Sequence, residues 1–307
     1  MSLHLFGSVI TAEGVAANNR GETEGNITTL QKLLWKGNVH TTVSAEAIRW
    51  AVRYYWQLTI GENEVNRVWD DKKSDHKWND PTWSGWLTDN GIKYIDDDLL
   101  GYMEAKAAQE DGEGSDENDN EKKKKKKKGT VIVRRGVFEI TRAISLLPYA
   151  GDITFNAKSG EKGRTSLYGT EVHATRYQYG FALTPERLEK KERTIQAIDA
   201  ILNLGEVAGN HSRFLYDFSP DSIILRVTDD PAPRLLFCFE QDEKGVITAG
   251  LLVKRIKAAD IKPEELYIGG PISENEELRS IPNIKVYPGV KAAAADFIKE
   301  AKSRLNL

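Results

Sequence analysis

The chain has few of the features that mark secreted, metal-binding or membrane proteins. Its 307 residues include one cysteine, Cys238, which excludes an internal disulfide and a zinc site built on cysteines. The apolar runs, such as residues 223–225 and 235–239, are far too short to span a bilayer. The opening MSLHLFGSVI has no basic segment and no small-residue cleavage site, so no signal peptide is expected. We therefore expect a cytoplasmic protein with no membrane partner, no metal and no cofactor.

An excess of positive charge is also missing. The formal net charge is −3, which alone does not indicate a nucleic-acid partner. The acidity is concentrated, however, since residues 58–121 hold 18 acidic and 6 basic side chains and are followed by seven lysines at 122–128. A basic groove elsewhere in the chain therefore remains compatible with the composition.

What is present indicates a globular α+β protein. Hydrophobic residues make up 40% and charged residues 29% of the chain, and its length allows one large domain or two smaller ones. A helix is expected to begin after Ser44, a good N-cap, with Arg49, Arg53 and Trp56 on one face. Residues 141–149 read as a short helical or turn segment. Strands are predicted at residues 4–11, 130–141, 172–183, 222–228, 234–240 and 247–256, and further helices at 185–204 and 291–305. This order favours a mainly antiparallel sheet.

Composition divides the chain into four parts. Residues 1–57 contain the first strand, a long loop and the first helix, and residues 58–106 read as a tryptophan-rich, largely irregular insertion. Residues 107–129 are low in complexity and are predicted to be a disordered loop. Its lysines could also tether phosphates, although the adjacent acidic run would partly neutralise them. Residues 130–307 hold the remaining strands and helices, with a Gly- and Lys-rich hairpin at about 155–169.

The stretch from residue 18 to residue 53 has side chains suited to a phosphate backbone. Asparagines can donate hydrogen bonds, glycines allow close approach and basic groups supply charge. Glu13, Glu22 and Glu24 oppose this reading, and no P-loop or dinucleotide signature is present. A polar surface loop with a solvated helix face fits the pattern equally well. The candidate phosphate contacts are Asn18, Asn19, Arg20, Asn26, Lys32, Lys36, His40, Ser44, Arg49 and Arg53.

Several motifs together resemble one family. They are ANNRGETEGN, TLQKLLWKG, VSAEAIRWAVR and IDDDLLGYM, followed later by RRGVFEITRAISLLPY, EVHATRYQYGFAL and the turn GNHSR. This combination resembles the DevR-type backbone subunits of type I-B CRISPR Cascade complexes, which form the seventh Cas family within the repeat-associated superfamily. The resemblance covers nearly the whole chain apart from the lysine tract, which is not a family motif.

The resemblance implies a fold and a role. Such proteins have a modified RNA-recognition-motif (ferredoxin-like) palm with inserted finger and thumb elements. Copies form a helical filament along a guide RNA (crRNA) and present it to a target DNA strand beside other Cascade subunits. Holding backbone and shape while base pairing reads sequence suits a filament that serves any guide.

Carried onto this chain, the resemblance places guide contacts at the polar loop, the helix start and the GNHSR turn. Residues 58–106 would be the fingers and the hairpin at 155–169 the thumb. Ala45 and Glu46 stand where many relatives outside the DevR branch have serine and glutamine, which leaves the donors there open. The additional RNA contacts are Lys158, Lys162 and Arg164 in the thumb, and Asn210, His211 and Arg213 in the turn.

Other functions are weaker fits. A metal-dependent endoribonuclease would need acid–base groups such as His40, His173 or His211, but type III relatives use an aspartate that the polar loop lacks. A DNA-binding transcriptional autoregulator would be expected to show a helix-turn-helix or zinc-finger pattern, and neither is visible. Asp70, Asp71, Asp75, His76 and Asp80 lack ordered metal spacing. Asp96, Asp97 and Asp98 are better explained as capping or turn residues. The expected role is therefore binding without catalysis.

Overall fold

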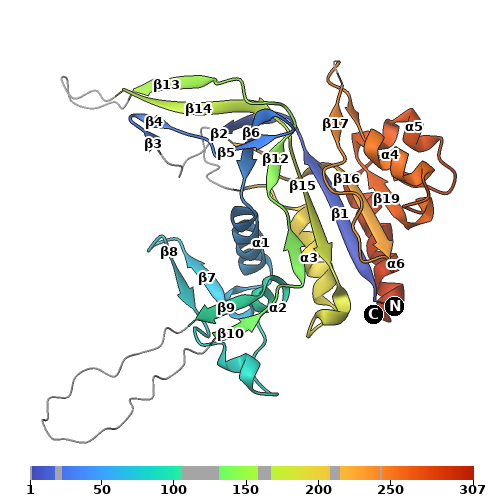
Figure 1. Cartoon of the computed structure of the whole chain (residues 1–307). Coiled ribbons are helices and arrows are strands. Elements are labelled where there is room, and N and C mark those ends of the chain that lie inside the picture. Colours follow the sequence, from blue (N-terminus) through green and yellow to red (C-terminus); the bar gives the residue numbers. More distant parts are fainter. Residues whose placement is uncertain (1, 18–22, 106–130, 158–166, 208–214, 243) are drawn as a thin grey trace, which may run out of the picture.

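A long mixed sheet organises the computed structural model, which describes residues 2–17, 23–105, 131–157, 167–207, 215–242 and 244–307. The sheet has the order β20-β19-β16-β1-β15-β12-β6-β5, and β11 also pairs with β15 (Figure 1). All of its neighbouring pairs are antiparallel except β19 with β20. Its strands are β1 (His4–Thr11), β5 (Lys32–Trp35), β6 (Asn38–Val43), β11 (Phe138–Ile140), β12 (Ala143–Ser145), β15 (Tyr177–Leu183), β16 (Pro220–Thr228), β19 (Leu266–Gly269) and β20 (Lys285–Tyr287).

Helices cover both faces of this sheet. Along β1, Leu5 and Val9 point to one face, and Phe6 and Ile10 point to the other, since successive strand residues alternate. Both sets are buried, which explains why residues 4–11 read as a continuous apolar run and confirms the predicted central strand. The helices are α1 (Ala45–Thr59), α2 (Ile95–Leu100), α3 (Arg193–Leu202), α4 (Gly250–Lys257), α5 (Glu276–Arg279) and α6 (Val290–Leu305).

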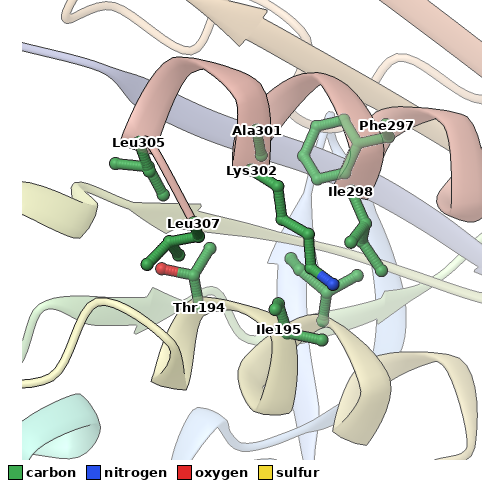
Figure 2. Close-up of a pocket in the computed structure, with 9 residues that line it drawn as sticks. Thr194, Ile195, Phe297, Ile298, Ala301, Lys302, Leu305 and Leu307 are labelled. Atoms are coloured by element: carbon green, nitrogen blue, oxygen red, sulfur yellow. The ribbon is translucent and has the colours of Figure 1, made fainter.

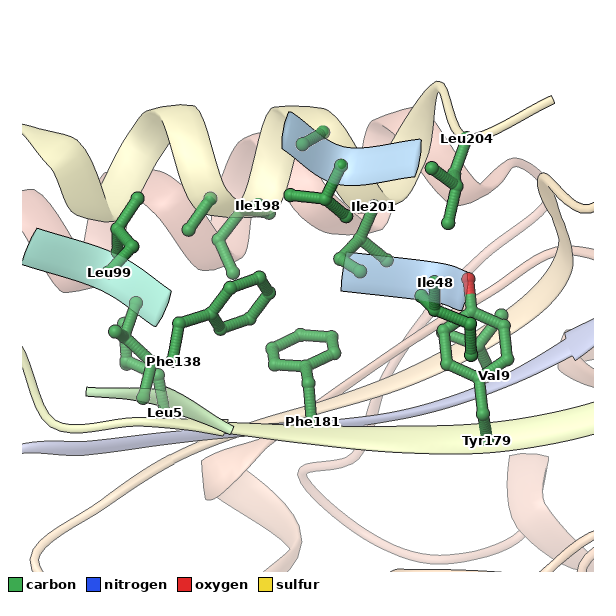
Figure 3. Packing of buried hydrophobic residues seen from close by; sticks show 14 of the residues in the cluster. Leu5, Val9, Ile48, Leu99, Phe138, Tyr179, Phe181, Ile198, Ile201 and Leu204 are labelled. Atoms are coloured by element: carbon green, nitrogen blue, oxygen red, sulfur yellow. The ribbon is translucent and has the colours of Figure 1, made fainter. Parts of the chain in front are cut away.

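The larger core lies between the sheet and the helices α1, α2, α3 and α6. Phe138 and Phe181 meet edge to face with centroids 5.7 Å apart, beneath Ile198 and Ile201 of α3 (Figure 3). The second core packs α4 and α5 against the opposite face, with Leu252 and Leu278 fully buried. Burial on both sides fixes the sheet as the rigid base from which the remaining elements project.

An arm extends from one end of the sheet (Figure 1). We use this name for β2 (Gly14–Ala17), β3 (Thr23–Glu24), β4 (Ile27–Thr28), β13 (Ile153–Ala157) and β14 (Leu167–Thr175). β14 pairs with β13 and β2 antiparallel and with β4 parallel. The predicted hairpin at 155–169 is therefore the outer part of a larger sheet, and it shares that sheet with the segment that follows the polar loop.

A finger region lies on the same side of the sheet as the arm, at the other end of α1 (Figure 1). It contains the hairpin β7 (Arg67–Asp70) and β8 (Asp75–Trp78), the 3₁₀ turn η2 (Ser84–Leu87), α2, and a two-stranded ribbon of β9 (Tyr102–Ala105) and β10 (Val131–Arg134). We call this pair of strands the ribbon. The insertion is thus less irregular than the sequence predicts, because short strands and the buried Trp83 organise it.

Several predicted elements are wrong. The predicted strand 130–141 is two strands in different sheets, β10 and β11, and residues 141–149 contain β12 instead of a helix or turn. The predicted helix 185–204 is a 3₁₀ turn, η3 (Pro185–Arg187), followed by the shorter α3. The opening unit is not a strand, loop and helix, because β2 to β6 intervene before α1.

Two apolar runs also differ from their predictions. Residues 234–240 are mostly irregular because Arg234 and Phe237 adopt positive φ (55° and 52°), which interrupts a strand. The predicted strand at 247–256 is mostly helical. Only its first two residues form a strand, β18 (Ile247–Thr248), which pairs with β17 (Glu240–Gln241), and α4 follows. The remaining 3₁₀ turns are Glu62–Glu64, Pro263–Glu265 and Pro271–Glu274.

Candidate nucleic-acid interface

A hollow of about 520 Å³ lies at the base of the finger region, between α1, the β7–β8 hairpin and the ribbon. We call it the larger hollow. Four arginines and three aromatic rings face it together with three carboxyl groups. Its lining residues are Glu46, Arg49, Arg53, Arg67, Trp78, Trp83, Asp96, Asp97, Leu100, Gly101, Tyr102, Met103, Val133 and Arg134.

Helix α1 holds two of these arginines in place. The helix begins after Ser44, whose Oγ accepts a hydrogen bond from the Ala47 backbone N–H at 3.1 Å, as the sequence predicts. One turn further, Arg49 donates to the Leu100 carbonyl at 2.5 Å, and Arg53 Nε donates to Asp96 Oδ2 at 3.0 Å. Since both arginines contact α2, the first helix and the finger region are fixed relative to each other.

Asp96, at the start of α2, ties the β7–β8 hairpin to α1. In addition to Arg53, Asp96 accepts the backbone N–H groups of Asn66 at 2.7 Å and Arg67 at 3.1 Å. The carboxylate therefore orients Arg67, which begins β7, toward the same hollow as Arg53.

Asp97 and Asp98 serve the other elements around α2. Asp97 accepts hydrogen bonds from Trp83 Nε1 at 3.0 Å and Trp86 Nε1 at 3.3 Å. Asp98, which is fully buried, pairs with Arg134 at 2.5 Å and with Arg193 at 2.6 Å. These three acidic residues therefore connect structural elements, a larger role than the turn or cap predicted from the sequence.

The electrostatics of the larger hollow favour an anion. Burial, and then repulsion from Arg53, lower the pKa values of Arg49 and Arg67. Neither of these two arginines has an ion pair to any residue that the structure describes. Burial, and then the charge of Asp96, raise the pKa of Asp97 to about 7, so this carboxyl opposes an incoming anion only partly at neutral pH. Crowded cations of this kind gain stabilisation when a phosphate arrives.

Aromatic rings flank the arginines. The Arg67 guanidinium carbon lies 5.5 Å from the centroid of Trp78, and that of Arg134 lies 4.1 Å from Trp86. Trp83 and Tyr102 are stacked with centroids 4.7 Å apart and an interplanar angle of 11°. Cations alternating with planar rings are typical of surfaces that hold single-stranded nucleic acid.

Comparison with known proteins decides the family. Residues 8–244 match the sequence profile of "CRISPR-associated negative auto-regulator DevR/Csa2". A "CRISPR-associated protein Cas7/Cst2/DevR" of Myxococcus xanthus (strain DK1622) is 45% identical over 318 residues, covering 99% of each chain. The chain belongs to the DevR/Csa2 family.

Solved structures match the fold of this DevR-family chain at much lower identity. A chain of a "CRISPR RNA-guided surveillance complex, pre-nicking" aligns with a TM-score of 0.56 at 11% identity, covering 97% of this chain and 100% of that one. A chain of a "CRISPR RNA-guided surveillance complex" aligns with a TM-score of 0.54 at 12% identity, covering 96% and 99%. At such identity, the likeness concerns the fold alone.

In this DevR-family structure, two predicted residues come together with two that the sequence did not single out. Arg49 and Arg53 share the larger hollow with Arg67 and Arg134. The latter two stand 14 and 81 positions further along the chain than Arg53, and no local motif joins them. Arg67 stands two positions before Trp69, whereas Arg134 has no tryptophan near it in the sequence. Trp56, predicted on the same face as Arg49 and Arg53, is instead buried, and its Nε1 donates to the Gln196 carbonyl at 3.0 Å.

The other described candidates lie along the arm and the adjacent sheet edge. Asn26 is exposed, and its carbonyl accepts the N–H of Gly169 at 2.9 Å. Lys32 pairs with Glu171 at 2.5 Å and lies 4.9 Å from the Tyr149 ring. Lys36 is exposed in the two-residue turn between β5 and β6, where it has φ 49°. Asn26 and Lys36 are open to a ligand, while Lys32 already has an acidic partner.

The His40 side chain is buried and contacts other residues of the protein. It is 6% exposed, and its Nδ1 lies 2.7 Å from the Ser145 carbonyl oxygen. The neighbouring Thr41 Oγ1 is 2.8 Å from His173 Nδ1 and 2.8 Å from the Tyr177 hydroxyl. Burial lowers the pKa of His173. The two histidines therefore meet in one buried polar network at the junction of β6, β12 and β14.

Nine candidates lie outside the described residues. They are Asn18, Asn19, Arg20, Lys158, Lys162, Arg164, Asn210, His211 and Arg213. The low-complexity stretch 107–129 also lies outside them.

Three other features of the described residues bear on function: potential metal ligands, a crevice between two helices, and helix length. Across the described ranges, no group of three or more His, Cys, Asp or Glu side chains could hold a metal ion. Figure 2 shows an apolar crevice between α3 and α6, lined by residues such as Ile195, Phe297 and Leu305. It has no room for even a water molecule, so it is a packing seam. Within the described part of the chain, no helix combines the length and the apolar character needed to cross a membrane.

Proposed function

We propose that this DevR-family protein binds the sugar-phosphate backbone of a guide RNA and forms the repeating backbone of a type I-B Cascade effector. The observation that carries the proposal is the convergence of Arg49, Arg53, Arg67 and Arg134 with aromatic rings on one hollow. Arginine forks match phosphate oxygens, and contacts to phosphates position a strand without reading its sequence. Copies aligned along the spacer leave base edges free for the target DNA.

The topology supports assigning the central sheet to an RNA-recognition-motif palm. In chain order, β1, α1, β12, β15, α3 and β16 form a β-α-β-β-α-β series, and the four strands stand in the order β16-β1-β15-β12. This series and strand order are those of the ferredoxin-like fold. On this proposal the finger region and the arm are insertions in the palm and correspond to fingers and thumb.

We further propose that the protein binds RNA in the cytoplasm without cleaving it. The two described histidines of the proposed ribonuclease set are buried in a structural network. A binder that serves any guide needs positioning and charge, and both are supplied by the hollow without a nucleophile or a metal.

The test is a titration of single-stranded RNA with the full chain and with a double variant, Arg49→Ala with Arg67→Ala. These two arginines have no carboxylate partner among the described residues, so their removal leaves no unpaired buried acid. We expect weaker binding by a similar factor on unrelated sequences. The slope of log K against log salt should become shallower by about 1.4, because each single-strand phosphate contact contributes about 0.7.

The matched control is Arg279→Ala with Lys262→Ala, which removes one exposed cation from α5 and one that directly precedes the turn Pro263–Glu265. Their neighbours Leu278 and Ile261 belong to the second core, on the face of the sheet opposite α1. Tight binding by the control and sequence-independent loss by Arg49→Ala/Arg67→Ala support the proposal. Failure of the unmodified chain to bind RNA, a stronger preference for duplex DNA at equal salt, or metal-dependent cleavage of the RNA would each refute it.

A further inference from the structure

A second hollow, of about 420 Å³, adjoins the larger one along the ribbon. We call it the smaller hollow. Tyr102, Val133 and Arg134 line both hollows, so the two meet at the ribbon without an intervening element. The lining residues of the smaller hollow are Trp86, Tyr102, Val133, Arg134, Arg135, Gly136, Val137 and Arg187.

The side chains that line the smaller hollow carry positive charge only, unlike those of the larger hollow. Three arginines line it and no carboxyl does, whereas four arginines face three carboxyls in the larger hollow. Arg187 is exposed, and its guanidinium has no hydrogen bond or ion pair to a described residue. Among the described residues, Arg135 pairs only with Glu139, four residues along, and both side chains are more than half exposed. Such a pair contributes little and is easily exchanged for a phosphate.

Arg134 is the fixed point between the hollows. Its Nη2 donates to Asp98 at 2.5 Å, and its guanidinium lies over the Trp86 ring. Its Nε is buried and has no partner among the described residues. Arg134 is therefore a cation in a fixed position that both hollows share.

We infer that the two hollows form one continuous track and that a single RNA strand crosses the ribbon from the larger to the smaller, where Arg135 and Arg187 bind its phosphates. This inference rests on the proposed function. Continuity with the arginines of the larger hollow favours a nucleic-acid strand over an acidic peptide. The Trp86 and Tyr102 rings at the crossing favour it as well, since bases stack on such rings.

The first experiment measures the salt dependence of single-stranded RNA binding by Arg135→Ala with Arg187→Ala. Both side chains are exposed, so the variant should fold normally. If both arginines contact phosphates, the slope of log K against log salt becomes shallower by about 1.4 relative to the unmodified chain. The control Arg279→Ala/Lys262→Ala should leave the slope unchanged. An unchanged slope for Arg135→Ala/Arg187→Ala overturns the inference.

The second experiment uses the burial of the single cysteine. Cys238 has no exposed surface, so an Arg187→Cys substitution supplies the one readily accessible thiol. We expect single-stranded RNA to slow maleimide labelling at position 187 several-fold and to leave labelling of an Arg279→Cys variant unchanged. Equal labelling rates at position 187 with and without bound RNA contradict the track.

The two proposals can fail separately. If the unmodified chain does not bind RNA, the proposed function fails. If Arg49→Ala/Arg67→Ala reduces the slope while Arg135→Ala/Arg187→Ala does not, the larger hollow binds RNA and the track alone is wrong. An acidic peptide that protects position 187 when RNA does not would assign the smaller hollow to a protein partner and overturn the inference.

Discussion

Replacing Asp98 should destabilise the protein more than replacing any exposed acid of the finger region. The carboxylate is fully buried and accepts four hydrogen bonds. They come from Arg134 at 2.5 Å, Arg193 at 2.6 Å and the backbone N–H groups of Glu189 at 3.1 Å and Lys190 at 3.3 Å. The Arg193 side chain is 4% exposed, so Asp98→Ala leaves a buried cation without its counter-charge. Breaking such a pair costs about 3–5 kcal/mol.

The measurement is unfolding in urea and by heat, followed by circular dichroism and tryptophan fluorescence. At about 2 °C per kcal/mol for a chain of this size, the Tm of Asp98→Ala should fall by roughly 6–10 °C. Asp89→Ala, which removes an exposed acid from the same region, should change stability by less than about 0.5 kcal/mol.

A double variant isolates the cause. Adding Arg193→Met to Asp98→Ala removes the unpaired cation and fills a similar volume, so part of the lost stability should return. A cost below about 1 kcal/mol for Asp98→Ala, or no recovery in the double variant, would refute the reasoning that Asp98 is held in place chiefly by its charge pairing.

Two further predictions concern the same region. Burial raises the pKa of Asp97 from 3.8 to about 7, so the folded state holds this proton more tightly than the unfolded chain does. The free energy of unfolding should therefore fall as pH rises from about 4 to about 7 and then level off. Urea unfolding measured at several pH values across this range should show that fall. An equally steep fall in Asp97→Asn would contradict the assignment of the pH dependence to Asp97. Gly101 has φ +71°, and a Cβ there would lie 2.4 Å from the Arg134 carbonyl oxygen. Gly101→Ala should lower the urea midpoint of unfolding by more than Gly205→Ala, because a Cβ at position 205 meets open space. Equal midpoints for the two variants would show that the backbone at Gly101 shifts to accommodate the Cβ and would contradict this prediction.

The sequence predicted the periodic and well-capped elements best. The strand at residues 4–11 and the helices that start after Ser44 and end at Leu305 have strong local signals, because burial pattern and capping act within a few residues. The α+β class and the family follow from these elements and from motifs spread along the chain.

Elements that tertiary context decides were predicted poorly. Residues 247–253 are mostly apolar, and such a short run fits a buried strand and a buried helix alike. Helical periodicity predicts Trp56 on the face that carries Arg49 and Arg53. Helix α1 packs against both the sheet and α3, however, so its buried face is wider than one stripe and includes Trp56.

Some residues of the candidate site could be predicted from local sequence patterns and others could not. Arg49 and Arg53 could be found because they are one helical turn apart. Arg67, Arg134 and Arg187 could not, because separate buried contacts around α2 and η3 bring them to the ribbon, and these contacts have no fixed spacing in the sequence. The partner of Lys32, Glu171, is likewise 139 positions away.

The connection between the arm and the sheet determines how the arm can move. β14 runs into β15 with only Arg176 between them, and β1 leads into β2 through two residues. Arg176 donates to the Thr11 carbonyl at 3.1 Å and pairs with Asp221 at 3.0 Å, which clamps both crossings. Both strands that lead into the arm are therefore tied to the sheet at the point where they leave it. Because β1 and β15 lie in the middle of the sheet, a displacement of the arm at this junction would act on the central strands and not on an edge strand.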